Sequence, residues 1–540
     1  MEEPDSSPSG VRTALLALAV PGNAAADTPS WDRHGTDGPE VINGFKHLVV
    51  IYEENHSFDN LYGTWGSVNN QHVEGLADAK QVNTTQITQD GDAYGCLLQV
   101  DVNLASPQPL PSTCVDKAHG VKASAFTNQP FTIDDHIAAT DKTCPKPGSP
   151  FQPNGVLKGS TDSEPGGCTR DIVHRFYQEQ YQLNGGAQNR YVTGSDAVGL
   201  TMGTYDTASL PIYKYLHSRR APNYVIADHF FQAAFGGSFL NHQYLVAARA
   251  PEDTAVAPPA AHSVLDANGF PNDSYPLYHP ATPVVDGQLT EVCPSSTPGM
   301  LACGDIAVNT MQPTNPPFGT GAQLPLIDDA IYPNIGDELS AKGTSWNWYS
   351  GGWDDAAAGH PGPLFQYHHQ PLNYWADYGP GKPGRVHFQD ENNFIAAAKR
   401  GTLPTVSLVK PYGAENEHPG YASEPNGSDH LVDLLQTVLS GPQARDTLVV
   451  VTYDEFGGQW DHVAPPRQGT DGVHDQYGPG TRVPALLISK SFQRSGVDHT
   501  SYDTTSILAT IEHGLDLAPL STRDAAVADL GNAVQVGRRN

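Results

Sequence analysis

Apolar runs that end in polar clusters recur along the chain. The clearest lies at residues 448–452, a Leu-Val-Val-Val-Thr run that is followed, after one tyrosine, by Asp454 and Glu455. A β-branched run of this kind predicts a strand buried on both faces, and the nearby Gly457 and Gly458 predict a flexible loop. Ligands of open parallel α/β sheets bind at the carboxyl ends of the strands. We therefore expect the two carboxylates at the floor of an active site.

Strand-like and helix-like patterns alternate through the rest of the chain. Further apolar runs predict strands at residues 47–52, 224–228, 345–349, 404–410 and 483–489. Helical spacing occurs at residues 170–183, 210–216, 327–341, 393–399, 430–439 and 504–517. Because strand, polar loop and helix follow one another, the sequence predicts an α/β fold, a doubly wound sheet with helices on both faces.

Four predicted strands lead into polar residues. These residues are Glu54 with Asn55, Ser238, His418, and Asp454 with Glu455. One such cluster is weak evidence of a site. Their repeated position at the same edge of the predicted sheet indicates that they meet.

Two long stretches interrupt the pattern. Residues at about 70–170 are rich in Asn, Gln, Pro and Cys, and residues at about 251–325 are rich in proline. We interpret both as loop insertions in a single catalytic domain at residues 40–521, with residues 522–540 as a C-terminal tail.

The N-terminal residues 1–26 have features of a signal peptide. Arg12 precedes an apolar run at residues 14–20, and three alanines at residues 24–26 resemble a cleavage site, although Glu2, Glu3 and Asp5 give the opening the wrong charge. No later run reaches the roughly 18 apolar residues of a membrane span. We therefore expect a periplasmic or secreted protein without stable membrane insertion.

The net charge argues against binding to polyanions, and the cysteine content predicts disulfides. The chain has 30 Lys plus Arg against 59 Asp plus Glu, and this formal net charge of -29 would repel nucleic acid and anionic lipid. The six cysteines include no C-x-x-C pair, and their even number predicts disulfides. Pairing of sequence neighbours would give Cys96–Cys114, Cys144–Cys168 and Cys293–Cys303, although order alone does not fix connectivity.

Ser238 has the surroundings of a nucleophile. Gly236 and Gly237 precede it where a helix is expected to start, so a tight turn can expose the hydroxyl near the positive end of the helix. This placement suits attack on an anionic group. The alternative is an ordinary serine N-cap, the more common role of a lone serine at a helix start.

The acids and the amide at the sheet edge predict a metal site. Glu54, Asn55, Asp454 and Glu455 offer hard oxygen ligands that suit one divalent cation, and the oxygen of Ser238 could complete the set. A cation in contact with Ser238 would lower the pKa of its hydroxyl. Histidines could then stabilise a phosphoryl group or protonate the leaving oxygen.

Other hydrolytic motifs are absent from the sequence. Leu240 stands where the last glycine of a G-x-S-x-G elbow would be, and there is neither a G-x-x-x-x-G-K-[ST] loop nor an H-E-x-x-H segment. The segment Ser238-Phe239-Leu240-Asn241-His242 also lacks the Pro and Arg of a sulfatase-type C/S-x-P-x-R motif.

Four segments together resemble a known family. They are Glu54-Asn55 with Ser57-Phe58-Asp59, Gly237-Ser238-Phe239-Leu240-Asn241-His242, His368-His369-Gln370-Pro371, and Thr452-Tyr453-Asp454-Glu455-Phe456-Gly457-Gly458. In this order, across residues 42–515, they resemble the bacterial phosphoesterase family of Francisella-type acid phosphatases and phospholipases C. The resemblance implies an alkaline-phosphatase-like fold.

The resemblance also implies roles for individual residues. Ser238 would be the nucleophile that is transiently phosphorylated, and with it Glu54, Asn55, Asp454 and Glu455 would hold the cation. The implied catalytic histidines are His119, His369 and His418, and the implied substrate contacts are His368, Asn241 and His242. Adjacent residues of an extended loop point in opposite directions, so of His368 and His369 we favour His369 as the one that faces the phosphate.

Two departures from the family pattern favour the acid-phosphatase branch. The wider family usually has arginine where this chain has His56, and its phospholipases usually have a Gly-Pro-Thr turn where this chain has Gly236-Gly237-Ser238. We therefore predict a metal-dependent phosphomonoesterase that acts on small phosphate monoesters through a phosphoserine. The alternatives are a phospholipase C type phosphodiesterase and, from another class, a non-catalytic secreted binding protein on the same fold.

Overall fold

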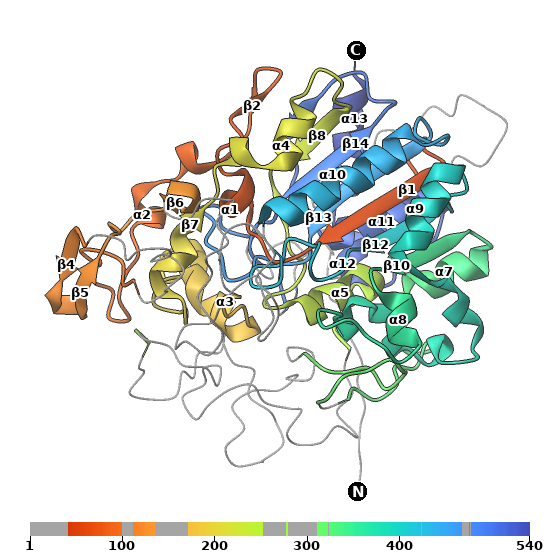
Figure 1. The fold of residues 1–540 in the computed structure, drawn as a ribbon, viewed down its shortest axis with the longest axis horizontal. Coiled ribbons are helices and arrows are strands. Elements are labelled where there is room, and N and C mark those ends of the chain that lie inside the picture. The colour runs from red at the N-terminus through yellow and green to blue at the C-terminus, as the bar shows by residue number, and fades with distance from the viewer. Residues whose placement is uncertain are drawn as a thin grey trace, which may run out of the picture. The chain divides into compact units, whose positions relative to one another are not determined.

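An eight-stranded sheet forms the centre of the fold in the computed structural model, which describes residues 42–99, 112–135, 171–251, 277–278, 310–321, 323–422, 424–466, 475 and 477–539 (Figure 1). The strands run in the order β11-β10-β12-β1-β13-β14-β8-β15. Their bounds are β1 His47–Glu53, β8 Asn223–Ala227, β10 Trp346–Ser350, β11 Phe388–Asp390, β12 Val406–Lys410, β13 Thr447–Tyr453, β14 Ala485–Ser489 and β15 Gly496–Asp498. Neighbouring strands are parallel except for β14, which is antiparallel to both β13 and β8.

The central pair of strands, β1 and β13, sets the geometry of the sheet edge. Both are rich in β-branched and aromatic residues and are almost entirely buried, which suits strands covered on both faces. Their register runs from His47 opposite Thr447 to Glu53 opposite Tyr453. The next residues, Glu54 and Asp454, therefore leave the sheet side by side.

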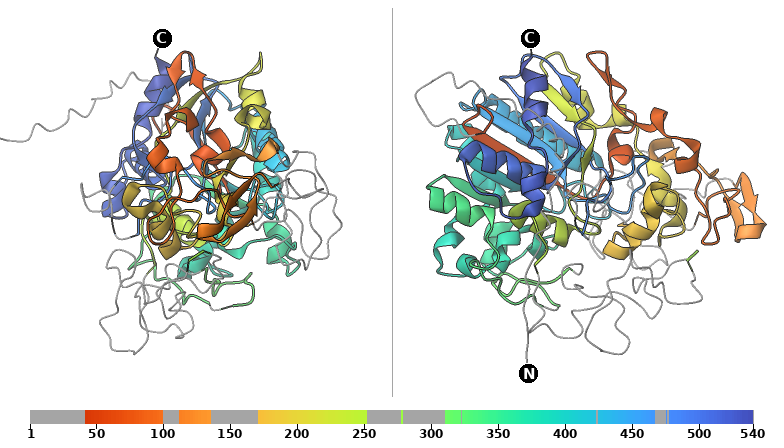
Figure 2. Two further views of the ribbon diagram at one scale, coloured as in Figure 1. Left: turned by 90° about the vertical axis from the view of Figure 1, so that its left-hand side faces the viewer. Right: turned by 180° about the vertical axis from the view of Figure 1, so that it is seen from behind.

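Helices cover both faces of the sheet. α9 (Glu391–Arg400) and α10 (Glu424–Ser440) lie on the face turned to the viewer in Figure 1. On the opposite face, in front in the right-hand view of Figure 2, lie α11 (Thr505–Leu515), α12 (Thr522–Ala526) and α13 (Gly531–Arg538). α10 packs beside α4 (Pro211–Leu216), and α11 beside α5 (Ser238–Ala247). The predicted α/β class with helices on both faces is confirmed.

Some elements differ from the sequence prediction. β11 and β15 are missed because three residues are too few to show a periodicity. The helix expected at residues 327–341 begins only at Ile335, as α7 (Ile335–Lys342), because Asn334 caps it by accepting a hydrogen bond from Asp337 N at 3.0 Å.

The C-terminal residues correct the expectation of a tail at residues 522–540. They form α12 and α13, and α13 packs against β8 and β15. Arg523 is buried and pairs with Asp503 at 2.8 Å and with Asp475 at 3.0 Å. The described part of this segment therefore belongs to the unit that spans Glu40–Asn540.

Further short helices and strands lie outside the central sheet, and some of them fall within the first predicted insertion. They are α1 Phe58–Tyr62, β2 Ser67–Val68, β3 Gln71–His72, α2 Gln81–Thr84, β4 Cys114–Asp116, β5 Val121–Ser124, β6 Phe131–Thr132, α3 Phe176–Leu183, β7 Gly203–Thr204, β9 Phe230–Phe231, α8 Trp353–Ala357 and β16 Tyr502–Asp503. The disulfide Cys96–Cys114 is confirmed. The other four cysteines and the predicted signal peptide lie outside the described residues. Among the described helices, none has the length and apolar character needed to span a bilayer.

Candidate active site

A pocket with a cavity volume of about 290 Å³ opens beside Glu54, directly after β1. Its lining residues are Glu54, Asp171, Ile172, Val173, His174, Arg175, Gly237, Ser238, Thr310, Gln366, His368, His369, His418 and Tyr421. Segments that are far apart in the sequence therefore meet at the carboxyl edge of the sheet, as the polar clusters predict.

Ser238 is held by a tight turn at the start of α5. Gly236 has a φ of +84°, and a Cβ added there would meet the backbone nitrogen of Phe176 at 2.5 Å, so only glycine fits. Gly237 is the N-cap, and Ser238 is the first helical residue. The alternative of a serine N-cap is therefore wrong, and the Ser238 hydroxyl is left to face the acids.

The predicted metal ligands converge on that hydroxyl. Ser238 Oγ lies 3.2 Å from Glu54 Oε2, 3.4 Å from Asn55 Oδ1 and 3.4 Å from Glu455 Oε1. Asp454 joins them through its Oδ1, which accepts hydrogen bonds from Asn55 N at 3.1 Å and Glu455 N at 2.8 Å. All four acid and amide side chains are buried.

The donor set has the oxygen-rich chemistry of a site that could hold a metal cation. Burial raises the pKa of Asp454 and of Glu455 well above its usual range. Burial would also raise the pKa of Glu54, but His369 and Lys410 hold it well below its usual value. Asp454 Oδ2 is buried without a hydrogen-bond partner among the described residues, and an orphaned carboxylate oxygen beside two further carboxylates suits a hard cation.

Two histidines fix the orientation of Asn55. His418 Nδ1 donates to Pro419 O at 2.7 Å, and His174 Nδ1 donates to Ile172 O at 2.5 Å. The Nε2 atoms of both rings therefore accept from Asn55 Nδ2, at 3.1 Å for His418 and 3.3 Å for His174. This arrangement turns the oxygen of the Asn55 amide towards Ser238, where a cation would need it.

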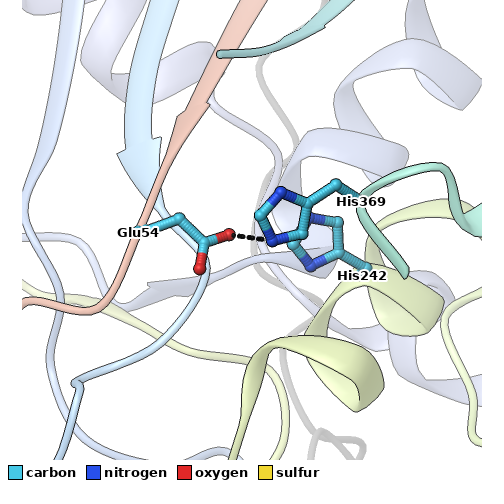
Figure 3. A group of neighbouring side chains, drawn as sticks. All are labelled: Glu54, His242 and His369. Atoms are coloured by element: carbon cyan, nitrogen blue, oxygen red, sulfur yellow. Dashed lines mark ion pairs between the residues drawn. The ribbon is translucent and has the colours of Figure 1, made fainter. Parts of the chain in front are cut away.

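Both His368 and His369 line the pocket. The expectation that only one faces the site is corrected, because residues Tyr367–His369 form a 3-10 turn and not an extended loop. His369 Nε2 lies 2.9 Å from Glu54 Oε1 (Figure 3). Burial lowers the pKa of both histidines.

His119 is not placed at the site, and His174 is found there instead. His119 lies in a turn beside β4, where its Nδ1 contacts Asp116 at 2.7 Å and its ring meets Tyr94 edge-on. His174 lines the pocket 3.3 Å from Glu455 Oε1. Sequence reasoning placed His174 inside a helix at residues 170–183, whereas α3 begins only at Phe176. The position of His174 just before the start of α3 is the sequence feature that could have identified it as a site residue.

Asn241 and His242 support the site from behind, and neither lines the pocket. Asn241 Oδ1 accepts from Ala234 N at 2.9 Å, and its Nδ2 donates to the carbonyl oxygens of Ala234 and Gly236. His242 Nδ1 donates to Ser238 O at 2.7 Å, and its ring stacks on His369 (Figure 3). The expected substrate contacts of Asn241 and His242 are therefore replaced by a role in shaping the turn.

Three other acidic and histidine residues have the spacing of metal ligands, but they belong to an ion-pair network. Asp59, Asp461 and His462 bring their ligand atoms together in the interior. Arg482 fills this position, with Nη2 at 3.0 Å from Asp59 and Nε at 3.1 Å from Asp461. These carboxylates thus have a cation already, in agreement with a structural role.

Glu179 in α3 connects the turn before Ser238 to the acidic loop after β13. Its Oε2 accepts from Gly236 N at 2.6 Å and from Gln232 Nε2 at 2.9 Å, and its Oε1 accepts from Thr481 N at 2.7 Å and Oγ1 at 2.8 Å. Gln232 Oε1 in turn accepts from Phe456 N at 2.8 Å. Burial raises the pKa of Glu179 to about 7, although these hydrogen bonds oppose the shift.

Replacing Glu179 with glutamine is expected to lower both stability and turnover. Glutamine keeps the shape but has one acceptor oxygen, so donors at Gly236 or Thr481 lose their partner. We expect the free energy of unfolding to fall by about 1–3 kcal/mol and kcat to fall about tenfold because the turn shifts. Urea denaturation and aryl phosphate kinetics measure the two effects, with Glu338→Gln on α7 as the control. A stable, fully active Glu179→Gln protein would contradict this role.

Comparison with known proteins gives one family match across most of the chain. A model described as Phosphoesterase family matches residues 45–518. Phospholipase C A of Mycobacterium tuberculosis is 24% identical over 531 residues, which cover 92% of this chain and 78% of that protein. Phospholipase C B of the same organism is 25% identical over 400 residues, which cover 68% of this chain and 64% of that protein. The match thus spans less than two thirds of the length of Phospholipase C B.

Two further similarities cover less of the chain. Non-hemolytic phospholipase C of Burkholderia pseudomallei is 30% identical over 217 residues, which cover 34% of this chain and 29% of that protein. Among solved structures, an alkaline phosphatase superfamily protein from Vibrio parahaemolyticus is 13% identical, with a TM-score of 0.24 over 36% of this chain and 50% of that one. At this TM-score the likeness adds nothing to the fold class, which rests on the sheet and its helices.

Proposed function

Because the chain belongs to the phosphoesterase family, we propose that it is a metal-dependent phosphomonoesterase that works through a phosphoserine at Ser238. The observation that carries the proposal is the convergence of Glu54, Asn55 and Glu455 oxygens within 3.2–3.4 Å of Ser238 Oγ. A buried hydroxyl at a helix start, surrounded by carboxylate and amide oxygens, has the surroundings of a metal-activated nucleophile. A binding protein without catalysis would have no need of this arrangement.

The residues present suggest a two-step reaction. A divalent cation held by Glu54, Asn55, Asp454 and Glu455 would lower the pKa of the Ser238 hydroxyl and withdraw charge from the phosphoryl oxygens. Ser238 Oγ attacks phosphorus, and its proton has the neighbouring carboxylates as acceptors. The bond to the alcohol oxygen breaks, and a pocket histidine relays to this oxygen the proton that the carboxylate took from Ser238. Water then attacks the phosphoserine, which releases phosphate and restores the hydroxyl.

The pocket wall supports phosphate monoesters as substrates. Apart from Ile172, Val173 and Tyr421, its lining side chains are polar or charged, and Gly237 has no side chain. Asp171, Arg175 and Gln366 offer charges and hydrogen bonds to a polar alcohol. A diacylglycerol would find few apolar partners among the described lining residues. The observation that favours the alternative, a phospholipase C, is that the similar proteins of Mycobacterium tuberculosis are phospholipases C.

A release assay separates the candidate functions. Purified protein is given an aryl phosphate monoester, an aryl phosphocholine diester and an aryl sulfate, at mildly acidic and at neutral pH. We expect kcat/KM for the monoester to exceed that for the diester by about 100-fold or more, as differences in pocket contacts allow. Exclusive cleavage of the diester would establish the phospholipase alternative, and no cleavage of any ester would favour the binding protein.

We propose that the protein is exported and carries out this activity outside the cytoplasm. The Cys96–Cys114 disulfide supports it, because disulfides persist in oxidising compartments such as the periplasm. The net charge of -29 supports small phosphate esters as partners over nucleic acid.

A further inference from the structure

A buried lysine stands beside the proposed metal ligands, and the reaction above does not use it. Lys410 is the last residue of β12 and is fully buried. Its ammonium makes an ion pair with Glu54 Oε1, donates to Glu53 O at 3.1 Å and lies 5.0 Å from the ring centroid of Tyr52. Lysines are almost never fully buried without a specific partner, so this charge has a task at the end of β1.

Lys410 divides the carboxylate of Glu54 between two sets of partners. Oε1 is shared by Lys410 and by His369, whose Nε2 is 2.9 Å away. Oε2 faces the nucleophile, at 3.2 Å from Ser238 Oγ. One oxygen is therefore fixed by Lys410 and His369, and the other is presented to the Ser238 hydroxyl.

The charges of the site balance only when Lys410 is counted. With a cation bound and all three carboxyl groups ionised, Glu54, Asp454 and Glu455 would carry three negative charges, and Lys410 places one positive charge in contact with the first of them. Two negative charges then remain, and one divalent cation would neutralise them. Buried charges are stable only when they are compensated in this way.

We propose that Lys410 is the internal counter-ion of the metal site, a positioning residue that acts through Glu54. It holds Glu54 Oε1 so that Oε2 meets Ser238, and it takes up one carboxylate charge so that a single divalent cation neutralises the rest. It also keeps the site from being too negative to admit a phosphate dianion. The effect on turnover rests on the proposed function, whereas the effect on cation binding does not.

The test replaces Lys410 with methionine, which keeps the length of the side chain and removes the charge. Titration of the metal-free protein with Mn²⁺ should show binding that is tighter by about tenfold or more, because a competing positive charge next to Glu54 is gone. On the aryl phosphate, KM should rise and kcat/KM should fall by about tenfold or more, because the site repels the dianion. Lys399→Met, an exposed change on α9, is the matched control and should alter neither quantity.

The two readouts distinguish a counter-ion from a structural residue. Mn²⁺ binding that is unchanged or weaker in Lys410→Met overturns the proposal, since loss of mere packing would weaken metal binding and turnover together. Lys410→Arg keeps the charge next to Glu54 and should hold Mn²⁺ within about threefold of wild type, because the Coulomb interaction with the bound cation is retained. If Lys410→Met does not fold, Lys410→Gln carries the same expectation, and failure of both while Lys410→Arg folds overturns the counter-ion role. If wild type binds Mn²⁺ but cleaves no phosphate ester, the proposed function fails while the binding test of Lys410 still stands.

Discussion

Replacing Ser238 with alanine is expected to reduce turnover of an aryl phosphate by at least about 10⁴-fold, because the attacking oxygen is lost. The buried hydroxyl makes no capping hydrogen bond, so its removal should leave the fold intact. Stopped-assay kinetics measure the loss, and circular dichroism checks the fold. Ser440→Ala on the exposed end of α10 is the matched control.

Trapping of the covalent intermediate tests the same residue without relying on rates. Acid quenching of wild type during turnover of a ³²P-labelled monoester should leave label on the protein, and peptide mapping should place it on Ser238. Ser238→Ala should carry no label. Near wild-type turnover in Ser238→Ala, or label on another residue, would show that Ser238 is not the nucleophile.

Removal of the divalent cation is expected to produce the second large loss of activity. Exhaustive chelation should lower kcat by at least about a thousandfold, because both activation of the hydroxyl and withdrawal of phosphoryl charge depend on the cation. Re-addition of Mn²⁺ or Zn²⁺ should restore activity. Stability should fall as well, by about 4 kcal/mol if the cation is normally present at a thousand times its Kd.

An Asp454→Asn variant locates the cation at the proposed site. Loss of one buried carboxylate should weaken metal binding by about 100-fold or more, which exceeds the effect of residues that only orient a ligand. Asp446→Asn removes an exposed carboxylate that pairs with Lys46, and it should leave metal binding unchanged. Full activity after chelation, with no metal in the purified protein, would remove the cation from the reaction.

The sequence predicted those parts of the site that follow directly from strands. Glu54, Asn55, Asp454 and Glu455 come immediately after β1 and β13, and parallel pairing leaves few places where they can lie. Ser238 was found because two glycines before a helix start are a local signal. Both cases depend on contacts between neighbours in sequence or in the sheet.

Residues in long connections could not be predicted in this way. His119 and His174 both lie outside the main strands, and only the tertiary path of the chain decides which one reaches the pocket. Asn241 has the spacing of a pocket residue, yet its amide is used up by the backbone of the turn. Lys410 looked like the last residue of a buried strand, and its contact with Glu54 depends on the pairing of β1 with β12.

The pairing of β1 with β13 also determines when the protein can become active during its synthesis. Asn55 N donates to Asp454 Oδ1, and these partners are 399 residues apart in the chain. At a translation rate of about 5–20 residues per second, the second half of the proposed metal site emerges roughly 20–80 s after the first. Contacts of such long range also form late in folding. A nascent or truncated chain that ends before β13 therefore lacks Asp454 and Glu455, and the proposed activity would report that both ends of the chain have come together.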